Sequence, residues 1–570
     1  MSASGKPSLR FAVMCNGTFL KEWQFRCIQQ VLELENTELV VLIENENTPS
    51  ALPFFNKTLQ RIFHFSFFRV YLRFWYKAKS IREVNTKAIF KNIPVLPCQP
   101  IIKNKHSHYF KEDDIKKITE LRLDFILRFG FHIIRGEILN TSRYGIWSYH
   151  HGDEQKYRGG PPGFWETYYH DNVCGAILQR LTNKLDSGVI LKKGYFKTMQ
   201  HSYSANTDML FFESARWPKQ VCIDIQNDVA QYLHHNAIET NAPLYRFPNN
   251  FQALNFFFIQ LKNKFLFHYI DLFCSEEWNV ALVDRPIQTF LSDSLVPSDF
   301  KWLPSPEKGT YAADPFGFLL AEELHILYEK YSYRQQKGTI SSVYYEKKSA
   351  TFTDYSVVIE KYHHLSYPYT LEHDQNIYCI PESYETNEVS LYLLDKQSFK
   401  WEKKGTLVKD FSAIDSTLFF YEQKWWLLCT NKGNPSALSL SVFYSSQLEG
   451  PFYPHRNNPV KTDIRSSRCA GTPFYHENNL YRPSQDCSKT YGGAITLNKI
   501  IKLTSTEYKE ESVRSLVPFD SKYKDGIHTL SSVGNYTLVD GKRIVFSADH
   551  FRRSWKRKMK KIFSRNIPKN

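Results

Sequence analysis

The hydrophobic pattern of the first part of the chain predicts alternating strands and helices. Leu9–Cys15 is an apolar run, Leu39–Ile43 is a β-branched run, and a further strand is predicted at Phe125–Leu127 before a helical turn at Glu137. Between the first two runs lies a helical pattern with the apolar positions Trp23, Cys27, Ile28, Val31 and Leu32. Strand, helix and strand at this spacing form a βαβ unit. We therefore expect an open parallel α/β sheet in residues 1–204, with its chemistry at the carboxyl ends of the strands.

An aromatic and basic insertion, residues 54–82, interrupts this pattern. It holds ten aromatic residues and seven Lys or Arg, with no Asp or Glu. A helical hairpin packed on the domain is one interpretation. An amphipathic helix that contacts anionic lipid is another. Nucleic acid is a third, although no recognition motif is present.

Helical patterns dominate residues 205–277, which we interpret as a connector. Helices are predicted over 224–235 and 251–273. The most apolar stretch, Phe256–Phe273, is interrupted by two lysines and an aspartate, and its period indicates a packed helix that does not cross a membrane.

From residue 278 the pattern changes to short strands separated by polar turns. A weak repeat recurs every 47 to 57 residues, with units that start at Asp314, Pro368, Asp415, Gly471 and His528. Five units of this length predict an all-β five-bladed propeller over residues 278–550. The strand at Trp278–Val283 is placed to close the ring from the N-terminal side.

Composition and charge limit the class of protein. A hydrophobic fraction of 42% excludes a wholly disordered chain. The net charge of +15 is uneven, because the tail, residues 551–570, holds nine Lys or Arg and no acidic residue. This tail is either a solvated terminus or a contact with an anionic membrane. The start of the chain lacks an apolar signal core, and the ten cysteines form no Cys-x-x-Cys pair, so we expect a cytoplasmic protein with reduced thiols, which the tail could hold at the inner face of the membrane.

The densest polar run of the first domain is Ser148–Pro162, and Leu-Asp-Ser-Gly follows at 185–188. A histidine that a carboxylate orients can take a proton from an attacking amine. His150 lies eight residues before Arg158 of a Tyr-Arg-Gly motif. With Asp186, this spacing resembles the formyltransferase family that uses 10-formyltetrahydrofolate, which includes sugar N-formyltransferases, over residues 9–200. The resemblance implies that His150 handles the proton, that Asp186 orients it, and that 10-formyltetrahydrofolate is the cofactor.

One position departs from this family. Ser148 stands where the family has an asparagine that stabilises the oxyanion, a contribution of about 3 kcal/mol in acyl transfer. Three interpretations follow. His151 replaces the amide, or the domain binds without formylating, or it transfers a different group.

Polar residues recur near the blade starts of the predicted propeller and are expected to converge at one mouth of its channel. They are Asp314, Glu329, Glu382, Asp415, Arg468, Arg482, Gln485, Asp486 and His528. The segments Tyr311–Phe316, Ile380–Ser383 and Leu480–Asp486 resemble five-bladed propellers of glycoside hydrolases, and more closely those attached to plant glucosamine inositolphosphorylceramide transferases. Three roles are open for the polar residues near the blade starts. They cap strands, they bind a glycan, or they catalyse glycosyl hydrolysis or transfer. No metal site is expected.

We therefore predict formyl transfer to an amino sugar in the synthesis of a surface polysaccharide or glycolipid, with the propeller binding the glycan. The partner is an amino sugar, a nucleotide sugar or a glycolipid, and nucleic acid is not expected. The first alternative is a glycosyl hydrolase or transferase whose chemistry lies in the propeller. The second is a non-catalytic scaffold that binds glycans.

Overall fold

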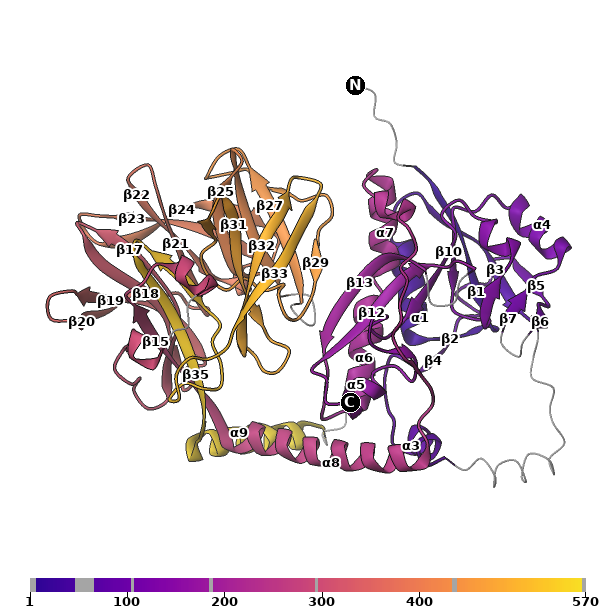
Figure 1. Cartoon of the computed structure of the whole chain (residues 1–570), viewed down its shortest axis with the longest axis horizontal. Helices are drawn as coiled ribbons and strands as arrows, with labels where there is room; N and C mark the ends of the chain where they lie inside the picture. The colour runs from indigo at the N-terminus through magenta and orange to yellow at the C-terminus, as the bar shows by residue number, and fades with distance from the viewer. Residues whose placement is uncertain are drawn as a thin grey trace. The chain divides into compact units, whose positions relative to one another are not determined.

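The computed structural model describes residues 7–46, 66–103, 107–183, 188–292, 296–432 and 438–565. The chain divides into two compact units, Met1–Phe265 and Leu266–Asn570 (Figure 1). The first unit mixes helices and strands, and the second is built almost entirely of strands. The finer boundaries at residues 204, 277 and 550 stay predictions.

A seven-stranded mixed sheet forms the centre of the first unit, in the order β13-β12-β10-β8-β1-β3-β5. Its strands are β1 (Leu9–Cys15), β3 (Thr37–Asn45), β5 (Val95–Cys98), β8 (Phe125–Arg128), β10 (Ile146–His150), β12 (Val173–Arg180) and β13 (Val189–Lys197). The five strands from β10 to β5 are parallel, whereas β12 and β13 extend the sheet in antiparallel pairing. The parallel α/β sheet is confirmed, and an antiparallel pair is added to it. The short strands are β2 (Phe19–Lys21), β4 (Glu83–Asn85), β6 (Ile101–Lys103), β7 (Ser107–Tyr109), β9 (Ile133–Arg135), β11 (Arg158–Gly159) and β14 (Leu244–Tyr245).

Helices of the first unit pack through apolar residues on this sheet or against other helices. They include α1 (Glu22–Leu32), α3 (Phe67–Phe74), α4 (Glu112–Glu120), α5 (Phe164–Tyr168), α6 (Tyr203–Ser214) and α7 (Trp217–Gln226). Of these, α3 and α5 pack against other helices. Helix α1 buries Trp23, Cys27, Ile28 and Val31, as the pattern predicts. Leu32 is 40% exposed, because the helix ends at this residue.

The helix predicted over 224–235 is not continuous. Helix α7 ends at Gln226, Asp228 adopts a left-handed backbone with φ of 56°, and a separate 3-10 helix covers Gln231–His234. Aspartate tolerates this conformation better than most residues, so it is a natural point at which a helix stops.

Helix α8 (Asn250–Phe273) continues from the first unit into the second. Only Ala253 and Phe256 of this helix are buried, so the prediction of a packed helix is wrong for most of its length. A last helix, α9 (Ala548–Arg565), ends the second unit. Among the described residues, no helix combines the length and the apolarity that a membrane-spanning segment needs.

Among its described residues, the second unit contains five antiparallel sheets. The first holds β15 (Cys274–Val283), β16 (Phe300–Trp302), β34 (Leu530–Val533) and β35 (Tyr536–Phe546). The second holds β17 (Thr310–Leu320), β18 (Glu323–Ser332), β19 (Lys337–Glu346) and β20 (Thr351–Ile359). The third holds β21 (Ser366–His373), β22 (Asn376–Glu382), β23 (Glu388–Asp395) and β24 (Lys400–Lys409). The fourth holds β25 (Ala413–Tyr421), β26 (Lys424–Asn431), β27 (Ser439–Ser445), β28 (Tyr453–Pro454) and β29 (Lys461–Thr462). The fifth holds β30 (Phe474–His476), β31 (Asn479–Asp486), β32 (Ala494–Leu503) and β33 (Tyr508–Leu516).

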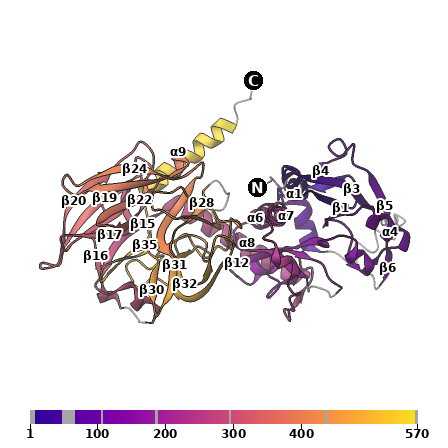
Figure 2. The ribbon, with the colours of Figure 1, turned by 90° about the horizontal axis from the view of Figure 1, so that it is seen from above.

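The first and last strands of this unit lie in one sheet. Strand β15 pairs with β35 along its whole length, from Cys274 opposite Phe546 to Val283 opposite Thr537 (Figures 1 and 2). The predicted repeat matches these sheets, since each repeat start lies in or just before the first strand of a new sheet or, for His528, before β34.

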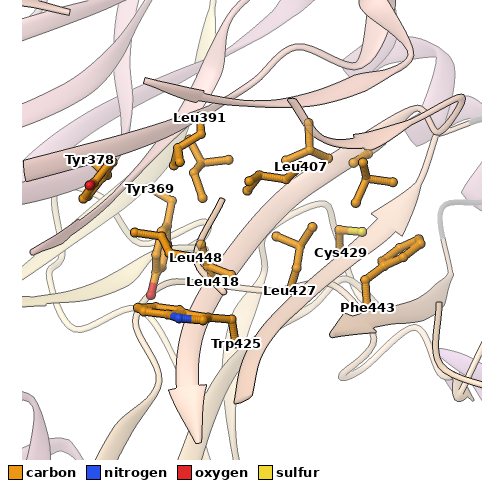
Figure 3. Packing of buried hydrophobic residues seen from close by; sticks show 14 of the residues in the cluster. Tyr369, Tyr378, Leu391, Leu407, Leu418, Trp425, Leu427, Cys429, Phe443 and Leu448 are labelled. Atoms are coloured by element: carbon orange, nitrogen blue, oxygen red, sulfur yellow. The ribbon is translucent and has the colours of Figure 1, made fainter. Parts of the chain in front are cut away.

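Apolar side chains fill the space between neighbouring sheets. The third and fourth sheets share a cluster that includes Tyr369, Leu391, Leu418 and Leu427 (Figure 3). Alternate residues of a strand face opposite sides of its sheet, so each sheet buries apolar residues against both neighbours.

Candidate functional site

The first strands of three successive sheets share an irregularity at the same place. Asp314 of β17, Tyr367 of β21 and Asp415 of β25 have φ of 53°, 42° and 52°. The strand register shifts across each of them. Such a bulge interrupts the regular alternation of side chains between the two faces of the sheet and turns one side chain in a new direction. At the fourth repeat start, Gly471 takes φ of 127°.

Two of these residues, Asp314 and Asp415, line a pocket of ≈ 390 Å³ in the second unit. Carboxylates and tyrosines dominate its wall. The lining residues are Glu276, Tyr311, Asp314, Glu329, Tyr331, Tyr333, Gln336, His364, Ser366, Glu382, Tyr384, Glu385, Ile414, Asp415, Lys432, Arg468 and Tyr491. They come from strands of the first four sheets and from the loops between strands.

Glu382 and Asp415 are adjacent in this pocket but differ in their partners. Arg468 Nε donates to Asp415 Oδ2 at 2.6 Å. Burial lowers the pKa of Arg468, but Asp415 outweighs this effect and holds the pKa well above its usual range. Glu382 Oε2 accepts a hydrogen bond from the Asp415 backbone N–H at 2.9 Å. Burial, followed by repulsion from Asp415, raises the pKa of Glu382 to about 8, so Glu382 is protonated at neutral pH.

Asp314 is held by His528, Thr529 and Tyr367. His528 Nε2 lies 3.5 Å from Asp314 Oδ1, Thr529 Oγ1 donates to the same oxygen at 3.1 Å, and the Tyr367 N–H donates to Oδ2 at 3.3 Å. Burial raises the pKa of Asp314 to about 6, against the opposing effect of His528. Asp314 is therefore mostly ionised at pH 7 and can accept a proton.

Asp540 lies on the other side of His528 and fixes its ring. Its Oδ2 is 2.5 Å from His528 Nδ1, and its Oδ1 accepts the backbone N–H groups of His528 and Thr529. Burial lowers the pKa of His528, but Asp540 and Asp314 together raise it above its ordinary value. Asp314, His528 and Asp540 place their ligand atoms within 4.8 Å of one another and could hold a metal ion, but the His528 ring already lies between the two carboxylates. The absence of a metal stays a prediction.

Glu329 is the least satisfied carboxyl group of the pocket. Its side chain is 4% exposed, and its Oε1 has no hydrogen-bond partner among the described residues. The nearest imidazole nitrogen, His364 Nε2, is 3.6 Å away. Burial lowers the pKa of His364 to about 4, so this ring is neutral. Burial, and then Asp314 and Glu382, raise the pKa of Glu329 well above its usual range.

Four of the predicted propeller residues, Arg482, Gln485, Asp486 and His528, are absent from the lining of this pocket. His528 contacts the lining residue Asp314 without lining the pocket itself. Arg482 is fully buried and donates to Glu510 Oε1 at 2.7 Å and to Glu510 Oε2 at 3.0 Å. Gln485 Nε2 donates to the Cys469 carbonyl at 3.0 Å, and Asp486 accepts from the Ser488 N–H at 2.9 Å. These contacts hold the fifth sheet and its adjoining loops together.

The sequence prediction omitted the tyrosines of the pocket and the histidine His364. Tyr311, Tyr331 and Tyr333 come from β17, β18 and the turn after β18. Tyr311 begins the segment Tyr311–Phe316, but no motif marks Tyr331 or Tyr333, because tyrosines are common throughout this chain, which has 35. Their alternation along the strands was the one available signal.

In the first unit, Ser148 and His150 lie on β10, next to β8. Arg128, the last residue of β8, donates from Nη1 to Ser148 Oγ at 2.6 Å. Burial lowers the pKa of Arg128 to about 10. His150 Nε2 lies 2.9 Å from the Tyr157 carbonyl oxygen. Asp186 lies outside the described residues, so its predicted pairing with His150 stays a prediction.

His151 does not stand in for the missing amide. Its ring stacks on Phe211 at 3.8 Å and lies against Tyr149 at 5.4 Å, in an aromatic core. Burial lowers its pKa to about 3. Alternation along the strand places Tyr149 on the side opposite to Ser148 and His150. His151 is thus a neutral core residue.

Comparison with known proteins points to the second unit. Residues 303–531 match the family described as glucosamine inositolphosphorylceramide transferase 1, N-terminal. Glucosamine inositolphosphorylceramide transferase 1 of Oryza sativa subsp. japonica is 32% identical over 269 residues, which are 44% of this chain and 36% of that protein. The Arabidopsis thaliana protein of the same name is 30% identical over 258 residues, 43% of this chain and 34% of that protein. The chain thus spans about a third of the length of these relatives.

Other similarities extend to formyltransferases and glycoside hydrolases. Methionyl-tRNA formyltransferase of Borrelia turicatae is 28% identical over 127 residues, 22% of this chain and 38% of that protein. Among solved structures, a family 117 glycoside hydrolase of Zobellia galactanivorans covers 49% of this chain and 92% of its own, with a TM-score of 0.31 and 13% identity. The match to glycinamide ribonucleotide transformylase 1 of Symbiobacterium toebii covers 40% of this chain and 86% of that chain, with a TM-score of 0.24 and 11% identity.

These findings correct the predicted function. Formyl transfer to an amino sugar is wrong as the main activity, because the family match and the plant relatives are transferases named for glucosamine inositolphosphorylceramide. They support the alternative of a carbohydrate-active protein with its chemistry in the second unit. The formyltransferase resemblance remains a similarity of sequence, and binding of 10-formyltetrahydrofolate stays a prediction.

Proposed function

We propose that the second unit is a five-bladed propeller whose central pocket binds a glycan and cleaves or transfers a glycosyl group. Three features support the ring. The five sheets follow one another along the chain, the first and last strands share a sheet, and bulged first strands aim side chains at one pocket. Pairing of the terminal strands is the usual way in which a ring of blades closes.

One observation carries the chemistry. Two buried carboxyl groups in the same pocket, Glu382 and Asp314, have pKa values of about 8 and about 6. At neutral pH the first is an acid and the second a base. Glycosyl cleavage needs this pairing of a proton donor and a carboxylate.

The proposed step uses both groups. Glu382 protonates the glycosidic oxygen as its bond to the sugar carbon breaks. Asp314 takes the proton of the attacking hydroxyl, from water in hydrolysis or from an acceptor alcohol in transfer. Asp415 and Arg468 keep charge next to Glu382 and tune its acidity.

An amino sugar is the proposed substrate class. The relatives are named for glucosamine on a glycolipid. In this chain Glu329 lines the pocket and its buried Oε1 has no hydrogen-bond partner among the described residues, so a sugar ammonium bound in the pocket would favour the ionised form of this carboxyl. The tyrosine rings provide apolar and cation–π surface for the same group.

The test uses the full chain and 4-nitrophenyl glycosides of glucosamine, N-acetylglucosamine and glucose in both anomers, together with inositolphosphorylceramide that carries glucosamine. We expect turnover of the glucosamine compounds. Glu382→Gln and Asp314→Asn should each lower kcat/KM by about 10²- to 10⁴-fold. Glu402→Gln, which changes an exposed carboxyl group of β24 outside the pocket, is the matched control and should keep the activity.

Two results would overturn the proposal. Unchanged turnover in both variants would remove the chemistry from this pocket. Calorimetric binding of glucosamine without turnover of any compound would leave a binding module in place of an enzyme.

A further inference from the structure

Helix α8 carries an exposed apolar stripe on its first half, within the first unit. The residues are Phe251, Leu254, Phe258, Leu261 and Phe265, which are 78%, 42%, 70%, 68% and 70% exposed. Steps of three and four residues place them on one face of the helix. The stripe is about 21 Å long at 1.5 Å per residue.

The opposite face of α8 holds the helix on the first unit. Phe256 is fully buried and stacks on Phe164 at 4.4 Å. Gln260 Oε1 accepts the Tyr203 N–H at 3.0 Å, and Gln260 Nε2 donates to the Gln200 carbonyl at 2.8 Å. The stripe is therefore the outward face of an anchored helix.

Helix α3 enlarges this apolar surface. Tyr71 of α3 packs against Phe257 of α8 with ring centroids 5.2 Å apart. At the end of α3, Phe74 and Trp75 are 61% and 65% exposed. Tryptophan at the edge of an apolar surface suits a boundary between water and lipid.

The two segments that carry α3 and the stripe are basic. Residues 66–82 and 244–265 contain no Asp or Glu. Their basic residues are Arg69, Arg73, Lys77, Lys79, Arg82, Arg246, Lys262 and Lys264. Lys262 and Lys264 lie on α8 itself and are exposed. Long basic side chains beside an apolar face reach anionic headgroups while the apolar residues enter the acyl boundary.

We infer that this stripe and the end of α3 dock the first unit on an anionic lipid surface. Each basic residue near such a surface adds attraction, and the exposed phenylalanines add apolar burial. A second copy of the chain fits the stripe poorly, because pairing would bring the lysines of two copies together with no carboxylate between them. The inference does not depend on the proposed glycosyl chemistry.

The test is co-sedimentation of the full chain with vesicles of phosphatidylcholine containing 30% phosphatidylserine, and with vesicles of phosphatidylcholine alone. We expect binding to the anionic vesicles only. Phe258→Ser with Phe265→Ser should weaken it at least about tenfold, because two apolar side chains no longer enter the lipid. Lys262→Glu with Lys264→Glu should also weaken it, and 0.5 M salt should do the same to the original protein.

The control is Phe19→Ser, a phenylalanine of the same unit that is 60% exposed and outside the stripe. It should bind as the original protein does. Circular dichroism and thermal unfolding show that each variant keeps its fold. Equal vesicle binding by the two serine substitutions would overturn the inference. So would a concentration-dependent dimer, seen by sedimentation velocity, that the same substitutions dissociate.

Discussion

Replacing Glu382 by glutamine should stabilise the second unit while it removes activity. Glu382 is 8% exposed, and its carboxyl group is protonated in the folded state at neutral pH. Unfolding releases that group to water, where it ionises, so ionisation favours the unfolded chain. Glutamine has nearly the same shape, can accept the Asp415 N–H, and does not ionise.

The size of the effect follows from the pKa difference. Between pH 4.5 and 8 the folded state binds more protons at this site than the unfolded state, so stability decreases as pH rises. At pH 7 this difference makes the folded state about 3 kcal/mol less stable than it would be with a side chain that does not ionise. The Glu382→Gln variant does not suffer this destabilisation, so its Tm should be about 5 °C higher for a unit the size of Leu266–Asn570. Near pH 4.5 the two proteins should unfold almost alike.

Differential scanning calorimetry from pH 4.5 to pH 8 measures this difference, with Glu385→Gln as the control because that side chain is exposed. The gain should increase with pH for Glu382→Gln and stay near zero for the control. A gain of the same size at every pH would show that packing, not ionisation, is responsible. No gain at pH 8, or a loss, would refute the reasoning that Glu382 is protonated in the folded protein.

Three further predictions concern other charges. Glu510→Gln should lower the free energy of unfolding by about 3 to 5 kcal/mol, measured by denaturant titration, because Arg482 is left buried without its carboxylate; a change below 1 kcal/mol would contradict this role. The pH profile of kcat/KM should be bell-shaped, rising near pH 6 with Asp314 and falling near pH 8 with Glu382, and Glu382→Gln should abolish the alkaline fall along with most activity. Deletion of residues 551–570 should weaken binding to phosphatidylserine vesicles at low salt and make no difference at 0.5 M salt; equal binding at low salt would remove this role from the tail.

Local patterns determine much of this chain. The run Leu9–Cys15 and the helix after it occur where the sequence predicts them, because the period of apolar residues directly reflects which face is buried. The repeat at intervals of about fifty residues likewise predicts one sheet for each repeat. The strand predicted at 278–283 pairs with β35, the last strand of the described residues.

The site depends on contacts between residues far apart in sequence. A bulge turns Asp415 toward Glu382 and Arg468. The repeat predicts that such residues meet at one mouth, but no local pattern shows which of them pair. Arg482 looked like a channel residue, but its partner, Glu510, lies two strands away in the same sheet. The partner of a buried charged residue such as Arg482 therefore decides whether that residue lines the pocket or stabilises the core.

The sequence also does not determine which residues of helix α8 are buried. Its sequence establishes an apolar face by spacing alone, and from spacing a packed helix was expected. Only the fold reveals that Phe256 lies inside while Phe258 and Phe265 face outward. Periodicity fixes which side chains share a face, because it is a property of one helix. What covers that face is set by the neighbouring elements, and these are assembled only in the tertiary structure.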